Sequence, residues 1–427
     1  MVEIVFSSLL IGLLTGTQPV SVEISPAMRT ASVEFVLDGA TVARDEEPPW
    51  SAVVDFGTDL KPHVVAAIAR DASGREVGRA QRPVNVPQAP AHLEILLERN
   101  GLGAPAAARL VATSVLKEKP ARQTLALDGV PLMLDGGGRA LLPRLDMKTA
   151  HVLSATAEFS ADAVARADLV LGGEVAEEAG SKLTAVAVRT SGGPAPTVES
   201  LRDALRGPAG PVRPIVVDTA GATILFVRNP SSTEAWSTLG LGQRDYPLKF
   251  DPADRFGFIW PVTREVEGGS ARTELFESMP PFPGKSGNFL WLLTRVSRPG
   301  DPVAPPYRFA DAVAVAGMQA CAGGTRRAVV LVQGADDEDA SQLAPAQVAS
   351  YLRSLSVPLH VWSLHGSNDP RWKGEQPEDI SSFVGLQLAV NRLKEDLAKQ
   401  RVVWVPGEWI PGQIQLTEKA RGVEPLR

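Results

Sequence analysis

A short motif occurs twice in the first half of the chain and limits how that half can fold. The turns Leu37-Asp38-Gly39 and Leu127-Asp128-Gly129 lie 90 residues apart, and the matching histidines, His63 and His151, lie 88 residues apart. Short alternating runs with Gly and Pro turns surround both copies, which is typical of antiparallel strands. A spacing of about 90 residues suits one immunoglobulin-like (Ig-like) β-sandwich per copy. We interpret both histidines as strand residues that hydrogen-bond locally.

The chain is too long for one core, because single cores stop growing at about 250 to 300 residues. A Pro-rich stretch, Pro83 to His92, predicts a stiff linker between the two sandwiches. Near residue 196 the pattern changes from strands alone to strands mixed with helices. We therefore predict three domains: an Ig-like sandwich at 1–87, a second at 88–195, and an α/β domain at 196–427.

Composition excludes several classes of protein. The chain is 44% hydrophobic and 22% charged, as in globular proteins, and has no run of about 20 apolar residues that could cross a membrane. With a net charge of -6 and no basic cluster, it is not expected to bind nucleic acid. Cys321 is the only cysteine, so an internal disulfide and a cysteine-based metal site are excluded.

The N-terminal residues allow two interpretations. An apolar run from Ile4 to Leu14 resembles the core of a signal peptide, but no Lys or Arg precedes it. The alternative is two short strands, the second alternating Val20, Val22 and Ile24. We favour the strands, and the chain has no convincing signal peptide.

The second half shows apolar strands among helical patterns. The segment TVESLRDALR predicts a helix, and helical apolar faces follow at Phe309 to Ala320, Val348 to Leu355 and Phe383 to Leu397. Strands are predicted at VRPIVVDTA, ATILFVRN, RRAVVLVQG, VPLHVWSL and RVVWVPG. Strands that are apolar on both faces and alternate with helices predict a mostly parallel sheet covered on both sides.

These segments resemble a known family. FADAVAVAGMQACAGGTRRAVVLVQGADDEDAS, VASYLRSLSVPLHVWSL and LAVNRLKEDLAKQRVVWVPGEW resemble bacterial von Willebrand factor A (VWA)-related proteins, and VEFVLDG with PPWSAVVDFG resembles the Ig-like domains that precede the VWA domain. The resemblance covers nearly the whole chain. It implies two Ig-like β-sandwiches followed by a VWA-like, Rossmann-type α/β domain with a mostly parallel sheet. It also implies export to the periplasm or the cell exterior.

A VWA domain typically binds Mg²⁺ or a similar cation through Asp-x-Ser-x-Ser, a Thr and a later Asp, the metal-ion-dependent adhesion site (MIDAS). The resemblance places Asn229, Ser231 and Thr233 at the first loop, with neutral Asn in place of the charged Asp. Tyr307 lies near the expected Thr. Asp336 and Asp337 lie two or three positions beyond the expected last Asp. A dication needs carboxylate oxygens, so we expect this degenerate site to bind Mg²⁺ or Ca²⁺ weakly or not at all.

No enzyme signature is present. His360, His365 and Ser363 lie on or just after one strand, and we interpret them as packing residues and not as a catalytic triad. We therefore expect a non-enzymatic protein-binding, scaffolding or adhesion-type protein without a required cofactor, whose protein partner the sequence does not identify. One alternative is an adhesion module that depends on Mg²⁺ or Ca²⁺. Another is a hydrolase whose site the residue spacing hides.

Overall fold

The structure, a computed structural model, describes all residues except 1, 9, 11, 87–90, 101–103, 115–118, 148–150, 161–162, 172–182, 193–194, 209, 215, 220, 229–247, 269–270, 285–288, 296–306, 322–323, 335–338, 365–371, 373–376, 408 and 427. The chain forms two compact units. The first comprises Met1–Lys182 with Val266–Thr273, and the second Leu183–Glu265 with Glu274–Arg427. β15 (Leu183–Thr190) thus belongs to the second unit. The α/β domain was predicted to begin later, at residue 196.

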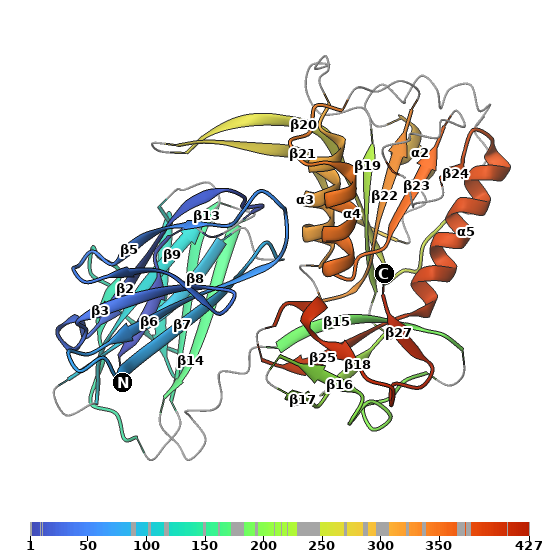
Figure 1. Cartoon of the computed structure of the whole chain (residues 1–427). Coiled ribbons are helices and arrows are strands. Elements are labelled where there is room, and N and C mark those ends of the chain that lie inside the picture. The colour runs from blue at the N-terminus through green and yellow to red at the C-terminus, as the bar shows by residue number, and fades with distance from the viewer. Residues whose placement is uncertain are drawn as a thin grey trace. The chain divides into compact units, whose positions relative to one another are not determined.

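The first sandwich consists of two antiparallel sheets (Figure 1). Its strands are β1 (Glu3–Phe6), β2 (Thr17–Ser25), β3 (Ser32–Leu37), β4 (Ala40–Asp45), β5 (Ser51–Asp55), β6 (His63–Arg70) and β7 (Glu76–Val84). A short 3₁₀ turn, Ala27–Arg29, follows β2. One sheet has the order β1-β2-β5 and the other β4-β3-β6-β7. β1 and β2 pair antiparallel, which confirms the two-strand interpretation of the N-terminal residues.

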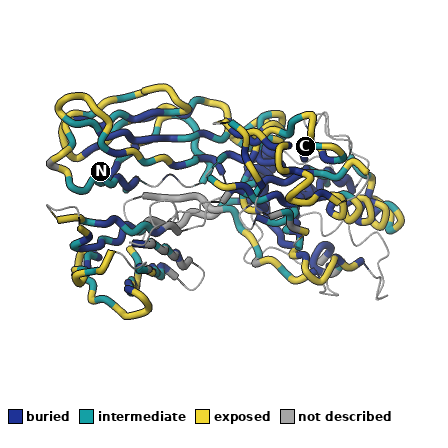
Figure 2. The backbone as a smooth tube through the Cα atoms, turned by 90° about the horizontal axis from the view of Figure 1, so that it is seen from below, coloured by how far each residue is buried: buried dark blue, intermediate teal, exposed yellow. Residues whose placement is uncertain are grey.

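The second sandwich repeats this arrangement strand for strand. Its strands are β8 (Ala91–Arg99), β9 (Pro105–Ser114), β10 (Arg122–Leu127), β11 (Val130–Leu132), β12 (Arg139–Leu141), β13 (His151–Ser160) and β14 (Ala163–Leu171). The sheet orders are β12-β9-β8 and β11-β10-β13-β14. Each sandwich buries its own apolar core, so the duplication read from the sequence is confirmed as two β-sandwiches. Figure 2 shows the resulting pattern of buried strands and exposed turns.

The repeated motif forms the same turn in both sandwiches. Asp38 and Gly39 have φ of 50° and 88°, and Asp128 and Gly129 have φ of 50° and 80°, as a tight Asp-Gly hairpin turn requires. Each histidine is the first residue of its strand and contacts the turn aspartate: His63 Nδ1 lies 2.6 Å from Asp38 Oδ2 and His151 Nδ1 lies 2.7 Å from Asp128 Oδ2. The prediction that both histidines hydrogen-bond locally is confirmed.

The two sandwiches are packed against each other. The Leu97 N–H donates to the Glu3 carboxylate at 2.6 Å, and the Arg82 guanidinium contacts Glu94 and lies over the Phe6 ring. Val5, Leu96 and Val111 form a small shared apolar cluster. The predicted linker at 83–92 is too long at both ends. Strand β7 continues through Val84, and β8 begins at Ala91.

The second unit contains a six-stranded sheet with the order β21-β20-β19-β22-β23-β24. Its strands are β19 (Ala222–Arg228), β20 (Arg255–Gly268), β21 (Ala271–Pro283), β22 (Arg326–Gln333), β23 (Leu359–Ser363) and β24 (Glu378–Asp379). The described helices are α2 (Phe289–Arg295), α3 (Phe309–Cys321), α4 (Pro345–Ser354) and α5 (Phe383–Lys399). α3 packs against α4, β19 and β22, while α5 packs against β22 and β24.

Two further sheets of the second unit are antiparallel. β18 (Val216–Asp218), β25 (Gln400–Pro406), β15 and β27 (Val423–Pro425) form one in that order. β17 (Gly210–Val212), β16 (Leu205–Gly207) and β26 (Gln415–Leu416) form the other, and a 3₁₀ turn, Pro411–Gln413, precedes β26. Within the described part of the chain, no helix combines the length and apolar character needed to span a bilayer.

The predicted fold class is wrong. The structure is mostly β, with 49% strand and 17% helix and many small antiparallel sheets, and its described residues do not form a VWA-like Rossmann domain with a mostly parallel sheet. Among the described strands, parallel pairing is confined to β19, β20, β22, β23 and β24. β25 is apolar enough for a parallel sheet but pairs antiparallel with β15 and β18. The helix predicted at TVESLRDALR is also wrong, since turns lead there into β16.

Candidate functional site

The predicted cation ligands cannot be placed. Asn229, Ser231, Thr233, Asp336 and Asp337 all lie outside the described residues, so the degenerate metal site stays a prediction. Among the residues that are described, no group of three or more His, Cys, Asp or Glu side chains could hold a metal ion.

The described residues beside these loops use their carboxylates to hold the start of α3. Asp339 accepts hydrogen bonds from Phe309 N at 2.9 Å, Ala310 N at 3.3 Å and Ser341 N at 3.0 Å. The bonds from Phe309 and Ala310 satisfy N–H groups that a helix leaves without partners in its first turn. We call Asp339, Ser341 and Asp311 the α3 clasp.

Asp311, on α3, in turn binds the segment that follows Asp339. Its backbone N–H donates to Ser341 Oγ at 3.1 Å, while its own carboxylate accepts from Gln342 N and Leu343 N, both at 3.0 Å, and from Arg308 Nε at 2.7 Å. Asp311 is 3% exposed. The carboxylates of Asp339 and Asp311 are therefore engaged by protein donors.

A different group of charged side chains lines a hollow at the opposite end of the parallel strands. His360 is the second residue of β23 and so lies at the amino end of the sheet, whereas the predicted cation loops follow the carboxyl ends. The hollow has a volume of about 310 Å³. Its walls come from β15, α4, β23, α5 and the α4–β23 loop: Arg189, Ala349, Leu352, Arg353, Val357, Pro358, Leu359, His360 and Asp396. We call it the charged hollow.

His360 lies between two carboxylates. Its Nδ1 is 3.7 Å from Glu378 Oε1 on β24, and its Nε2 is 3.7 Å from Asp396 Oδ2 on α5. Burial of the ring opposes protonation, but Asp396 and Glu378 outweigh it and raise the pKa of His360 to about 9. At neutral pH the imidazole is therefore a cation. The α5 residue Arg392 adds a further charge 3.5 Å from Glu378.

Asp396 remains an anion in this setting. Burial alone would favour its neutral form, but His360 and Arg189 lower the pKa of the Asp396 carboxyl. Arg189 Nη2 contacts Asp396 Oδ1, and Gln400 Nε2 donates to Asp396 Oδ2 at 3.3 Å. The carboxylate thereby fixes the positions of two cations, His360 and Arg189, in the wall of the hollow.

The wall of the charged hollow is cationic. Arg189, Arg353 and His360 contribute three positive charges to the described lining, where Asp396 is the carboxylate; Glu378, which contacts His360, lies outside the lining. Fixed cations in the wall of a cavity favour a negatively charged ligand.

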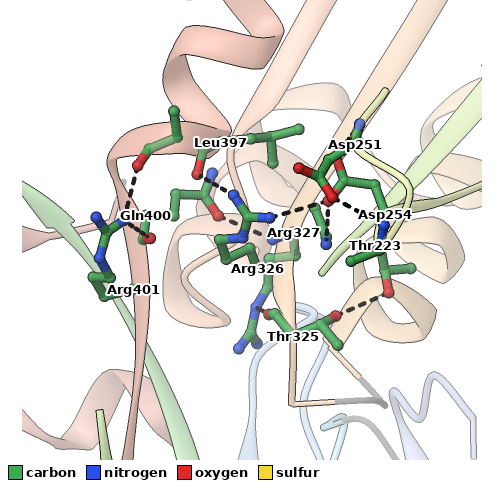
Figure 3. A network of polar contacts seen from close by, with 12 residues as sticks. Thr223, Asp251, Asp254, Thr325, Arg326, Arg327, Leu397, Gln400 and Arg401 are labelled. Carbon is green, nitrogen blue, oxygen red and sulfur yellow. Dashed lines mark hydrogen bonds and ion pairs between the residues drawn. The ribbon is translucent and has the colours of Figure 1, made fainter. Parts of the chain in front are cut away.

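A polar network at the amino ends of β19 and β22 positions the end of α5 (Figure 3). Asp254 accepts from Ala222 N at 2.7 Å and from Arg326 Nη2 at 3.1 Å, and Arg326 Nη1 donates to the Leu397 carbonyl at 3.1 Å. Arg327 N donates to Gln400 Oε1 at 2.9 Å. Because the Gln400 amide also donates to Asp396, the network connects the sheet to the charged hollow.

A second, larger hollow of about 570 Å³ adjoins the first along β15. Its lining is largely apolar: Val186, Ala187, Val188, Arg353, Ser356, Pro411, Gly412, Ile414, Gln415, Leu416, Pro425 and Leu426. Arg353 lines both hollows. We call this second cavity the apolar hollow.

The described lining of the charged hollow contains cations and a carboxylate but no side-chain nucleophile. None of its nine lining residues carries a hydroxyl or thiol that could serve as a nucleophile. A histidine with a pKa near 9 is already protonated at neutral pH, so it cannot serve as a general base there. The described wall instead resembles an anion site, in which fixed cations and donors meet a negative group.

Sequence reasoning missed this site although it noted His360. The histidine was interpreted as a packing residue on a strand, and nothing near it in sequence indicated the carboxylates that flank it. Asp396 lies 36 residues later and Arg189 lies 171 residues earlier. A local signal is the four-residue spacing of Asp396 on α5 and Gln400, the first residue of β25, whose side chains are hydrogen-bonded.

Comparisons with known proteins identify no family. No family model and no curated protein matches the chain. Among solved structures, the fibronectin(III)-like modules of Clostridium thermocellum CbhA match at 15% identity and a TM-score of 0.17, over 19% of this chain and 93% of theirs. Proximal thread matrix protein 1 from the mussel byssus matches at 15% identity and a TM-score of 0.28, over 44% and 48%. The central fibronectin-III array of RIM-binding protein matches at 10% and 0.22, over 46% and 80%. At these scores the likenesses carry no argument about function.

Proposed function

We propose that this chain is a non-enzymatic binding protein that holds a protein partner through an acidic group of that partner placed in the charged hollow. The observation that carries the proposal is the cationic wall formed by Arg189, Arg353 and His360 around a cavity of about 310 Å³. That volume is at the lower end for ligand sites and suits a single acidic group with its neighbouring atoms.

Three properties of the wall support an anionic partner group. His360 carries a charge at neutral pH because Asp396 and Glu378 stabilise its protonated form. Arg189 is held in place by Asp396, so little side-chain entropy would be lost when it binds an anion. Arg353 is exposed and can reach a group that enters from solvent.

Affinity selection from synthetic peptide pools tests the proposal. One pool contains hexapeptides with an acidic residue at one position and a free C-terminal carboxylate, and the other contains amidated hexapeptides without acidic residues. Mass spectrometry identifies the peptides that the purified full chain retains. We expect enrichment from the acidic pool only, because the wall has an excess of positive charge.

Charge reversal localises the binding. Arg353→Glu places a carboxylate at the hollow and is expected to abolish the enrichment. The matched control is Arg206→Glu, a charge reversal at an exposed arginine on β16 outside both hollows, which should leave the enrichment intact. Equal retention of both pools, retention of neither, or unchanged enrichment with Arg353→Glu would contradict the proposal.

A further inference from the structure

The charged and apolar hollows are adjacent. Consecutive residues of β15 pass from one to the other, since Ala187 and Val188 line the apolar hollow and Arg189 lines the charged one. On the α4 side, Arg353 borders both. Both cavities lie within the second unit, so their adjacency is a property of one compact body.

The two hollows demand different chemistry from one occupant. The charged hollow presents three cations, Arg189, Arg353 and His360, beside the carboxylate of Asp396. The apolar hollow presents mainly aliphatic side chains and backbone, with Ser356 and Gln415 as polar groups. A matching occupant carries an anion next to apolar side chains.

We propose that the occupant is the C-terminal end of a protein chain whose last residues are apolar, with its α-carboxylate in the charged hollow and its last side chains in the apolar hollow. The proposal rests on the binding function above and specifies the group that is bound.

A chain terminus fits this arrangement better than an acidic side chain. In a C-terminal residue the carboxylate and the side chain branch from the same Cα atom, so both hollows can be filled at once. An internal Glu or Asp would bring a second stretch of chain past the charged hollow. Terminal carboxylates are commonly bound by concentrated hydrogen-bond donors, as Arg189, Arg353 and His360 provide here.

Four hexapeptide pools separate the contributions, each titrated against the full chain and monitored by fluorescence anisotropy. The first ends in two residues drawn from Leu, Val, Ile and Phe with a free carboxylate. The second is the same pool amidated. The third is amidated with one internal Glu, and the fourth has a free carboxylate after Ser and Asn. We expect the first to bind most tightly, with amidation weakening it by about tenfold or more because the peptide loses the charge that complements the cationic wall.

The variants Arg353→Glu and Arg206→Glu then localise the effect. Arg353→Glu should remove the difference between the free and amidated pools, and Arg206→Glu should preserve it. Circular dichroism of each variant verifies that the fold is intact, and the comparison among peptides on the unaltered chain holds whatever the variants do.

Each other outcome contradicts the inference. If the free and amidated pools bind alike, no anionic group is recognised, and both the inference and the proposed function are wrong. If the internal-Glu pool binds best, the bound group is an acidic side chain and the inference is wrong, although the proposed function stands. If the Ser and Asn pool matches the apolar pool, the apolar hollow is not the second subsite. If no pool binds and the acidic selection above also retains nothing, the inference and the proposed function both fail.

Discussion

The most informative residue of the second unit is His360. Its imidazole lies between Asp396 on α5 and Glu378 on β24. Arg189 on β15 and Gln400 at the start of β25 contact Asp396, and Arg392 on α5 contacts Glu378. Arg353 on α4 lines the same hollow. The two carboxylates raise the pKa of His360 to about 9 despite its burial. His360 is therefore positively charged at neutral pH before any partner binds.

The raised pKa makes a prediction about stability. Because the pKa of His360 in the folded chain exceeds the ordinary value of 6.5, protonation stabilises the fold fully below about pH 6.5, and this contribution is lost as pH rises through 9. Urea denaturation should show that the free energy of unfolding falls between pH 7 and pH 10. The fall should be smaller in His360→Gln, which has no ionisable group there. The same decrease in both proteins would contradict the assignment.

At the scale of elements, the α3 clasp predicts a stability effect. Asp339→Ala removes the acceptor for Phe309 N and Ala310 N at the start of α3. Loss of such a cap costs about 1 to 2 kcal/mol, so the midpoint of urea denaturation should shift to lower concentration. The control, Asp203→Ala, alters an exposed aspartate in a turn, where we expect a change within about 0.5 kcal/mol. Equal shifts in the two variants would show that Asp339 does not cap the helix.

The elements also show what sequence alone could predict. The Asp-Gly turns at Asp38 and Asp128 depend on two adjacent residues that tolerate positive φ, so the repeat and its hairpins were readable. Helices α3, α4 and α5 were equally readable, because each has an apolar face at helical spacing.

The pairing of strands was not readable in the same way. β25 is apolar on both faces, which a parallel strand and a covered antiparallel strand share. Its partner β15 lies more than 200 residues earlier, and nothing in either segment specifies that pairing. The charged hollow could not be predicted for the same reason, because β15, β23 and α5 are far apart in the sequence and meet only in the folded chain.

At the scale of the whole molecule, we expect that neither folding nor peptide binding requires a divalent cation. The position of the first-loop Asp is occupied by Asn229, and the described carboxylates of the α3 clasp, Asp339 and Asp311, are engaged by protein donors. Calorimetric titration with millimolar Mg²⁺ or Ca²⁺ should give no binding heat, and the thermal midpoint should not move. A saturable heat at either cation would instead support the metal-dependent alternative. Export of the chain likewise stays a prediction.

In this proposal the two sandwiches have a structural role, and the second unit binds the partner. In the first unit, the feature shared by the two copies is a turn whose aspartate contacts a strand histidine. The second unit contains both hollows. We therefore expect substitutions in the second unit, and not in the first, to abolish peptide binding.

Nuclear magnetic resonance of chain labelled only at its five histidines tests the central claim most directly. Excess acidic peptide pool should move the ring signals of His360, while His63 and His151, which contact the turn aspartates of the sandwiches, should stay in place. The neutral amidated pool should move none of the three. An unmoved His360 signal, or the same movement with both pools, would show that the charged hollow does not bind an acidic group.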